Sequence, residues 1–479
     1  MSNKYNGLLC TECNMPLFET RSGDVCVNGH GGNEGWDPEE HMSLDYIYDW
    51  LDNIKNTSGT NDKIALLIQY LADDGFLQII KLMYDDKLHY GVKQMPLCEK
   101  RKFNRQNLIK FLLTLSKQKG TSDSDKGRLA ELCSVDSKTK KVVHMIINKD
   151  AKSGFGAKTI NKAYPDTVYI ESYMRCSTEK KVDNIVYPAF VQQKANGMFC
   201  NLKLYKNGKL EFISRNGKKI HQLGRLKQLL KKRIPKKFWG VVIHGELEVE
   251  IDGVIQDRQT GNGILNSCLS NTADQKLADC VILKIWDAVP MKAYNNHFFD
   301  LSYEKRLKRC RRIVKHVKYK SFTCIRTKIV HSFKEAQEFY KLIRSLGGEG
   351  AVLKNFNLKW KNHTATEAIK MKNISEGEFR IVRLNKGKPG TKWENNVGSI
   401  ECESECGKVK FSVGGLTDEE HLRDWDDWLT DIGSVCSCEF EGLIKDKKRK
   451  DIYSLYLPRN LVLRPERTYA DTLKDLQTR

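Results

Sequence analysis

The sequence has no uninterrupted apolar run that approaches the ~20 residues a membrane-spanning helix needs. Its first residues, Met1-Ser2-Asn3-Lys4, carry no apolar segment of the kind found in secretion signals. Internal repeats and low-complexity tracts are also absent. These absences argue against a membrane-embedded chain and a repeat architecture, and they predict a cytoplasmic protein with no membrane partner.

Acidic residues are scarce relative to basic ones. The chain has 81 Lys and Arg against 60 Asp and Glu, a formal net charge of +21. The imbalance is uneven, because residues 1–50 contain nine acids and two bases, so that the remaining residues carry +28. An excess of this size favours a polyanionic partner such as nucleic acid.

A disulfide framework is not indicated either. Most of the fifteen cysteines are scattered singly, which is typical of reduced thiols in a cytosol. One group differs, because a C-x-x-C pair and a C-x-x-x-H pair lie within the first 30 residues. Thiolates and an imidazole at this spacing close a tetrahedral shell around Zn²⁺, and a small segment with little core needs such a staple. The expected ligands are Cys10, Cys13, Cys26 and His30, with His41 as the alternative to His30.

Length and pattern predict an α+β multidomain chain. At roughly 100–200 residues per domain, 479 residues make two to four domains. Residues 43–160 show helical spacing, and Ser43 is a good N-cap for a helix over 44–54. From about 170 to 372 strands dominate, with a hairpin of Asn201–Tyr205 and Leu210–Ser214 around an Asn-Gly turn.

The last hundred residues again favour strands. Residues 379–384, 397–403, 409–413 and 438–441 are predicted strands, and 422–428 a helix between them. Short strands and a helix in about 100 residues suit an OB-fold β-barrel, a common nucleic-acid module. The expected domains are a zinc-binding extension (1–41), a helical domain (42–168), an antiparallel-sheet domain (169–374) and an OB-fold domain (375–479).

Six short blocks in a fixed order point to one chemistry. The first is a K-x-x-G turn at Lys194, which alone is uninformative because chance matches are common. The others are Ser214-Arg215-Asn216-Gly217, His244-Gly245-Glu246-Leu247, Trp286-Asp287, Glu349-Gly350-Ala351-Val352-Leu353-Lys354-Asn355 and Lys370-Met371-Lys372. A lysine amine attacks the α-phosphate of a nucleotide once burial and nearby cations favour loss of its proton.

The other residues of these blocks suit a nucleotide site. Lys370 and Lys372, two apart on a strand, share a face and would place positive charge on the α-phosphate. Glu246 and Glu349 would hold Mg²⁺ near the phosphates or bind the ribose, since phosphoryl transfer relies on positioning and charge neutralisation. Trp286 would stack on the adenine face.

In this order the blocks resemble the covalent nucleotidyltransferases, and most closely the ATP-dependent DNA ligases of the T-even phage type. The resemblance covers roughly residues 42–479. It implies a helical DNA-binding domain, an antiparallel-sheet nucleotidyltransferase (ATP-grasp-like) domain and a C-terminal OB-fold. It also implies ATP with Mg²⁺ or Mn²⁺, and a monomer that acts on nicked duplex DNA, in a host cytoplasm if the source is viral.

The resemblance assigns a role to each block. The lysine of the K-x-x-G turn becomes adenylated, the S-R-x-G block contacts the nick, and the E-G-x-x-L-K and K-x-K blocks bind metal and α-phosphate. A block near the C-terminus orients the pyrophosphate, and a glycine segment of the helical domain approaches the DNA backbone. The residues implied are Lys194, Lys370 and Lys372 in catalysis; Glu246, Trp286, Lys354, Arg464 and Arg467 at the cofactor; Ser214, Arg215 and Gly154 at DNA; and Glu349 at Mg²⁺.

Three positions depart from the family pattern. The aspartate of the K-x-D-G motif is Asn196, the arginine two residues past its glycine is Phe199, and the aspartate of D-G-E is His244. These departures predict either a slower reaction or compensation by neighbours such as Arg215 and Lys203. Two alternatives stay open: an RNA ligase or RNA-capping guanylyltransferase, which shares the K-x-x-G core, and a catalytically weakened DNA-binding scaffold.

Overall fold

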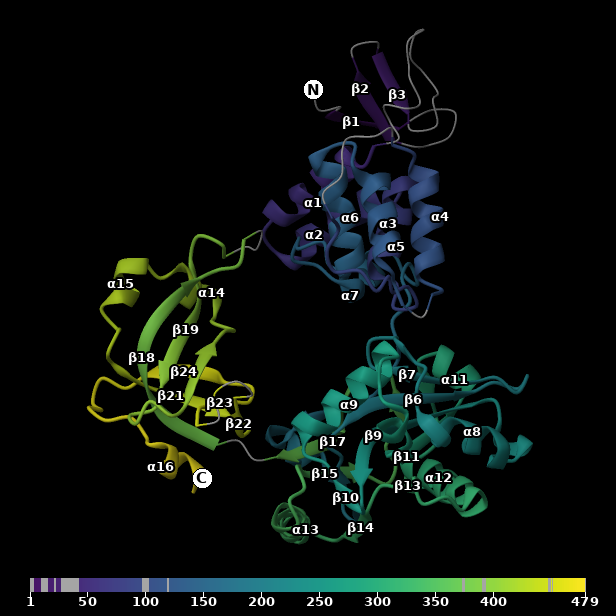
Figure 1. Cartoon of the computed structure of the whole chain (residues 1–479), viewed down its shortest axis with the longest axis vertical. Coiled ribbons are helices and arrows are strands. Elements are labelled where there is room, and N and C mark those ends of the chain that lie inside the picture. The colour runs from purple at the N-terminus through teal and green to yellow at the C-terminus, as the bar shows by residue number, and fades with distance from the viewer. Residues whose placement is uncertain are drawn as a thin grey trace.

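The computed structural model describes the backbone of residues 4–9, 16–20 and 23–26, and residues 43–96, 103–118, 120–372, 375–389, 393–446, 449 and 451–478. Figure 1 shows a helical body over residues 45–163, a central body over residues 175–372 and a C-terminal body over residues 375–477. None of the described helices combines the length and apolarity that a membrane crossing demands.

The helical body packs its helices around one apolar core. They are α1 (Asp45–Asn56), α2 (Thr60–Tyr70), α3 (Asp74–Tyr84), α4 (Arg105–Leu115), α5 (Asp123–Cys133), α6 (Ser137–Asn148) and α7 (Ala157–Ala163). Phe76 and Val143 are fully buried in this core. Asp73 and Asn104 cap α3 and α4 by accepting backbone N–H bonds that the first helical turn leaves unpaired. The helical spacing therefore predicted this region correctly, but Ser43 is not the cap of α1, which begins after Leu44.

The central body contains two main sheets. The first consists of β6 (Met198–Leu204), β7 (Leu210–Ser214), β8 (Lys219–Ile220), β9 (Val241–Ile251), β10 (Val254–Ile255), β11 (Val281–Pro290) and β13 (Phe322–Cys324), in the order β13-β11-β9-β6-β7-β8 with β10 paired to β9. The second consists of β4 (Arg175–Thr178), β5 (Ala189–Lys194), β14 (Thr327–Val330), β15 (Gly350–Asn355) and β17 (Thr364–Lys372), in the order β14-β5-β15-β17-β4. Pairing is antiparallel except between β11 and β13 and between β17 and β4.

Alternation along the strands gives the first sheet two different faces. Ile243 and Leu247 of β9 pack with the buried side chains of α8 (Gly224–Arg233), α9 (Arg258–Ser270) and α12 (Tyr303–Val317). His244 and Glu246, at the positions between, line a cavity on the other face. The second sheet is covered in the same way by α13 (Phe333–Ser345). Helices therefore cover the outer faces, and the cavity collects polar side chains from the inner ones.

The C-terminal body is built on one antiparallel sheet. Its strands are β18 (Ser375–Lys386), β19 (Val397–Glu403), β20 (Lys410–Val413), β21 (Val435–Phe440) and β24 (Arg459–Leu463), in the order β20-β19-β18-β21-β24, with a separate hairpin of β22 (Leu443–Lys445) and β23 (Tyr453–Leu455). The described strands close no barrel, so the OB-fold stays a prediction. The single helix predicted over 422–428 is wrong, because α14 (Asp418–Leu422) ends and α15 (Trp425–Leu429) begins again with Asp424 as its cap.

Near the N-terminus, β1 (Lys4–Leu9), β2 (Pro16–Thr20) and β3 (Gly23–Cys26) pair antiparallel. Cys26 ends β3, whereas Cys10, Cys13, His30 and His41 lie outside the described residues. The zinc site therefore stays a prediction.

Candidate active site

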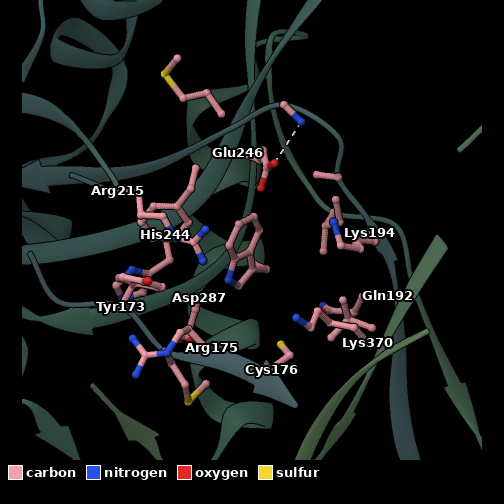
Figure 2. A pocket seen from close by; sticks show the side chains of 18 of the residues that line it. Tyr173, Arg175, Cys176, Gln192, Lys194, Arg215, His244, Glu246, Asp287 and Lys370 are labelled. Carbon is pink, nitrogen blue, oxygen red and sulfur yellow. Dashed lines mark hydrogen bonds between the residues drawn. The ribbon is translucent and has the colours of Figure 1, made fainter. Parts of the chain in front are cut away.

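A cavity of about 930 Å³ lies between the two sheets of the central body. Figure 2 shows side chains from both sheets pointing into it. Seven of the predicted site residues line it: Lys194, Ser214, Arg215, Glu246, Trp286, Lys354 and Lys370. Residues from separate sequence blocks therefore line one cavity, because the strands that carry them are neighbours in the two sheets.

Lys194 ends β5 and begins the K-x-x-G turn. Its Nζ lies 2.5 Å from Oε1 of Glu349, which precedes β15, and β5 and β15 are paired. The turn passes so close to β9 that a Cβ on Gly197 would lie 1.9 Å from the carbonyl oxygen of Leu247, which explains the requirement for glycine. The amide of Gly197 donates to Glu246 at 3.0 Å, and this bond fixes the turn against β9.

Glu246 is a half-buried carboxylate between the turn and the cavity. Burial raises the pKa of Glu246 to about 7, although the Lys194 ammonium and the Gly197 amide favour its charged form. Glu349 and Glu248 add negative charge nearby and raise the pKa further. A carboxylate with this environment gains from a ligand that donates a hydrogen bond or brings positive charge.

Asn196 makes a contact that the sequence did not reveal. Its Oδ1 accepts a hydrogen bond of 2.9 Å from Nη1 of Arg258, the first residue of α9. The same guanidinium lies 3.8 Å from Oε2 of Glu349 and packs over the ring of Tyr456 in the C-terminal body. Arg258 also lines the cavity. Arg258 therefore places a cation against Asn196, the residue that replaces the motif aspartate. The contacts of Arg215 and Lys203 are instead with Tyr173 and Glu171.

The two lysines of the K-x-K block have different partners. Lys370 lines the cavity, and burial together with the charge of Lys372 lowers its pKa. Lys372 instead forms an ion pair with Glu441 of the C-terminal body, which Arg459 also contacts at 2.9 Å. Buried Met371 between them packs into the core on the opposite side, so that both lysines occupy the inner face as predicted.

Trp286 presents an aromatic wall. Its ring lies 6.1 Å from that of Phe199 and 5.7 Å from Nζ of Lys354. Burial lowers the pKa of Lys354. Next to Trp286, the buried carboxylate of Asp287 accepts two hydrogen bonds from the guanidinium of Arg306. Burial alone would raise the pKa of Asp287, but the charge and the hydrogen bonds of Arg306 lower it. The wall therefore combines a flat ring with a basic group suited to a nucleotide base and phosphate.

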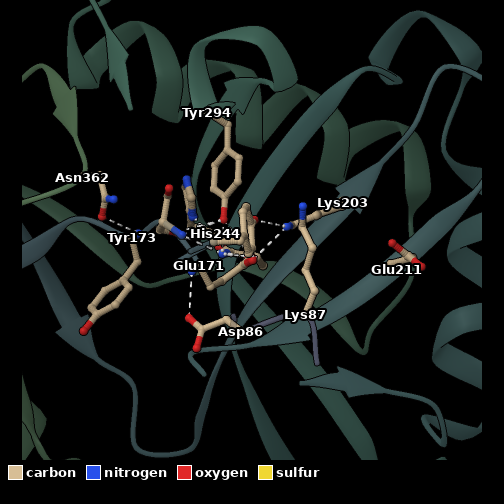
Figure 3. A network of polar contacts seen from close by, with 12 residues as sticks. Asp86, Lys87, Glu171, Tyr173, Lys203, Glu211, His244, Tyr294 and Asn362 are labelled. Atoms are coloured by element: carbon tan, nitrogen blue, oxygen red, sulfur yellow. Dashed lines mark hydrogen bonds and ion pairs between the residues drawn. The ribbon is translucent and has the colours of Figure 1, made fainter. Parts of the chain in front are cut away.

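His244 is part of a buried polar network, which Figure 3 shows. Its Nδ1 lies 2.7 Å from Oδ1 of Asn201, whose amide nitrogen donates to Glu171 at 2.7 Å. Oδ1 is thus the acceptor, and Nδ1 of His244 carries the proton. The imidazole stacks on Trp360 with ring centroids 5.5 Å apart. Burial lowers the pKa of His244 to about 4, so the ring is neutral at pH 7.

The same network explains the place of Lys203. Its Nζ lies 2.9 Å from Oε2 of Glu171, and it does not line the cavity. The expectation that Lys203 replaces the missing arginine is therefore wrong. Glu171 also ties the central body to the helical body, because its backbone N–H donates to Asp86 at 3.0 Å.

Arg215 extends from the S-R-x-G turn at the cavity mouth. Its guanidinium lies 4.6 Å from the ring centre of Tyr173. The turn abuts the helical body, since a Cβ on Gly217 would lie 2.3 Å from the carbonyl oxygen of Asp86. The turn and the helical body therefore present one continuous surface beside the cavity.

Three predicted site residues lie away from the cavity. Arg464 contacts Glu376 at 3.4 Å and Glu378 at 3.7 Å within the C-terminal body, and Arg467 is exposed nearby. Gly154, with φ of 71°, precedes α7 in the helical body, where a Cβ would lie 2.8 Å from Nζ of Lys63.

The two carboxylates beside Lys194 fit a divalent cation. Oε2 of Glu349 is buried without a hydrogen-bond partner, and the charge of Glu349 is near enough to Glu246 to raise the pKa of the Glu246 carboxyl. Two carboxylates plus phosphate oxygens and water are the ligands that Mg²⁺ prefers. No group of three or more His, Cys, Asp or Glu arranged for a metal is present in the part of the chain that the structure describes.

The region that contains the cavity resembles known proteins. Residues 171–372 match the family model described as the ATP dependent DNA ligase domain. The DNA ligases of Enterobacteria phage T4 and Enterobacteria phage T6 are each 27% identical over 480 residues, covering 89% of this chain and 97% of the relative. The solved structure named Pmar-Lig_PreS3 matches with a TM-score of 0.69 at 19% identity, over 87% of this chain and 98% of that chain, which supports the fold. Residues 171–372 therefore carry an ATP-dependent DNA ligase domain, and the chain as a whole is similar to the phage DNA ligases over most of its length.

Proposed function

We propose that this ligase seals nicks with a 5′-phosphate and a 3′-hydroxyl in duplex DNA through an AMP adduct on Lys194. The observation that carries the proposal is Lys194 itself, on the cavity wall and 2.5 Å from Glu349. The DNA ligase relatives favour DNA over the RNA-joining and RNA-capping alternatives. The shared cavity of Lys194, Glu246 and Lys370 argues against a mere scaffold.

The reaction proceeds in three displacements at phosphorus. First, the Lys194 nitrogen attacks the α-phosphorus of ATP, a P–N bond forms and pyrophosphate leaves; Glu349 is placed to accept the amine proton. Second, an oxygen of the 5′-phosphate attacks the same phosphorus, and the lysine leaves. Third, the 3′-hydroxyl attacks the 5′-phosphorus, a phosphodiester forms and AMP leaves. A divalent ion, when bound, neutralises phosphate charge in this chemistry.

The remaining cavity residues hold the nucleotide. Trp286 offers its ring to the adenine, and Lys354 beneath it offers a buried cation. Glu246 accepts a ribose hydroxyl or contributes to the metal site. Lys370 places its charge at the α-phosphate. We also assign to Arg258 the positive charge that Phe199 does not supply, since its guanidinium is held by Asn196.

The C-terminal body has to move during this cycle. In the present position of this body, its Glu441 forms an ion pair with Lys372, and the ring of its Tyr456 packs against the guanidinium of Arg258. Arg464 and Arg467 reach the pyrophosphate of ATP only if this body changes position. We keep an OB-fold for this body, the domain limits 42–168, 169–374 and 375–479, a monomeric state, and zinc on the N-terminal cysteines as further proposals.

The test begins with the adduct. Wild-type chain, Lys194→Ala and the control Lys328→Ala, an exposed lysine on β14, are incubated with Mg²⁺ and [α-³²P]ATP. We expect acid-labile label on the wild type and the control, and none on Lys194→Ala. Label on Lys194→Ala would refute the assignment, and label from [α-³²P]GTP instead of ATP would favour a capping enzyme. Sealing of a nicked DNA duplex but not of nicked RNA then tests the substrate.

A further inference from the structure

Basic side chains concentrate on one outer surface of the central body. We define the α8–α12 surface as the Lys and Arg of residues 224–238 and 304–320, which include the short helix η3 (Lys236–Phe238). These two segments contain sixteen Lys or Arg and a single acid, Glu304, a net +15 of the chain's +21. All of them except the buried Arg306 are exposed or half-buried. Most of the net charge therefore lies on two short stretches of chain.

This surface lies on the opposite side of the first sheet from the cavity. Leu230 of α8 and Ile313 of α12 are fully buried against the outer face of that sheet. Glu246 and His244 occupy its inner face, in the cavity wall. Figure 1 places α8 and α12 on the side of the central body that faces away from the C-terminal body. The cavity and the α8–α12 surface are therefore separated by the thickness of the first sheet.

Side-chain contacts hold the two segments together as one surface. Nη1 of Arg233 donates to the carbonyl of Lys318 at 2.9 Å, and Nζ of Lys237 lies 3.1 Å from Nε2 of His316. The ring of Phe238 packs edge-on against His316 at 5.2 Å. These contacts bring cations from separate segments close together, although like charges repel.

The charge pattern on α12 is unfavourable for the isolated helix. Lys308 and Arg312 are four residues apart, as are Arg311 and Lys315, and like charges at this spacing destabilise a helix. Within the helix, Nζ of Lys308 forms an ion pair with Glu304 at 2.7 Å. An external polyanion removes this repulsion, whereas internal acids do not.

We propose that the α8–α12 surface binds the phosphate backbone of duplex DNA at a site separate from the nick. Mixed Lys and Arg on exposed helix faces match closely spaced phosphates. The fifteen residues of α12 span ~22 Å, the length of about six base pairs. No large apolar side chain of these segments is among the exposed ones, so they lack the wedge with which a helix enters a lipid surface.

The site has a consequence for how the enzyme finds nicks. Backbone contacts carry no sequence information, so they support sliding and transfer along DNA. A second segment of duplex, or the distant flank of the same one, stays bound while the cavity releases a sealed site. The inference does not depend on the assignment of Lys194.

The test compares two triple variants of the full chain. Lys231→Gln/Lys232→Gln/Lys315→Gln removes three exposed charges from the α8–α12 surface. The control Lys328→Gln/Lys334→Gln/Lys341→Gln removes three exposed charges from β14 and α13 of the same body. Binding of an intact duplex of about 40 base pairs is measured as a function of salt. Loss of three phosphate contacts reduces the salt slope by about 2.7, so the affinity advantage of the wild type shrinks about 40-fold between 50 and 200 mM salt.

A second readout separates this site from the cavity. Single-turnover sealing of a short, pre-adenylated nick at saturating enzyme should be the same in both variants. Equal salt slopes for the surface variant and the control would overturn the proposal, as would surface-dependent binding to phosphatidylserine vesicles or polyglutamate without a change for DNA. If the salt slopes of the surface variant and the control differ as expected but the wild-type chain seals no nick, the proposed function is refuted and this inference is supported.

Discussion

Glu246 should make the stability of the central body fall as pH rises. Burial raises its pKa to about 7, from an ordinary value of 4.5. Because the folded-state pKa is above the unfolded one, the folded chain favours the protonated carboxyl. The contribution of Glu246 to stability is therefore complete below about pH 4.5 and is lost as pH rises through about 7.

The size of this effect follows from the shift. A difference of roughly 2.5 pKa units at ~1.4 kcal/mol each gives about 3 kcal/mol between low and high pH. Glu246→Gln cannot ionise, so the variant should gain about 2.5 kcal/mol relative to the wild type between pH 5 and pH 8, because part of the effect is already lost at pH 5. For a unit of about 200 residues, that difference moves the melting temperature by roughly 5–10 °C.

Calorimetric melting of the full chain without ATP or Mg²⁺ at both pH values measures the effect. The quantity of interest is the difference between Glu246→Gln and wild type at pH 8, minus the same difference at pH 5. Glu250→Gln is the control for removing a carboxylate from the same strand, β9. If the Glu246→Gln difference is equal at pH 5 and pH 8, or no larger than the control, the inferred burial of a charge at Glu246 is wrong.

Three further outcomes follow from the site. Arg215→Ala should slow sealing of pre-adenylated nicks more than it slows self-adenylation, whereas equal slowing of both steps would place Arg215 at the nucleotide. Arg258→Ala should slow self-adenylation about tenfold or more, as expected for loss of a positioned charge at the phosphates, and an unchanged rate would remove it from that role. Freshly purified protein should contain one zinc per chain, and its absence by elemental analysis would refute the N-terminal site; deletion of residues 1–41 should leave sealing measurable.

Strands with strong local signals were predicted well from the sequence. The hairpin of β6 and β7 forms around the Asn-Gly turn, and β19 has the bounds predicted for it, 397–403. The helix over 422–428 failed, because Asp424 offers its side chain to the amide of Asp426 and starts a new helix, a local competition that apolar spacing does not register. Ser43 failed as a cap because its hydroxyl contacts Asp45 instead of the amides of α1.

The sequence predicted those site residues that belong to the six blocks. It did not predict residues outside the blocks, whose roles depend on contacts that only the folded chain makes. β5, β9, β15 and β17 bring the blocks together because they are neighbours in the sheets. Arg258 belongs to no block, and only the missing charges at Asn196 and Phe199 signalled that another cation was needed. Lys203, which had the right charge, lies on the strand position that faces Glu171.

His244 shows why a single departure from a motif has no meaning until its neighbours are known. An aspartate at this position would put a carboxylate beside buried Asp287 and near Glu171, where each charge already depends on a partner. A neutral imidazole avoids that repulsion and also donates to Asn201. Since Asn201 binds Glu171, and Glu171 binds Asp86 of the helical body, the substitution joins the cavity wall to the body expected to hold DNA. The altered motif is therefore one end of a coupled set of residues, and replacing His244 alone by the family's aspartate should damage both the wall and that connection.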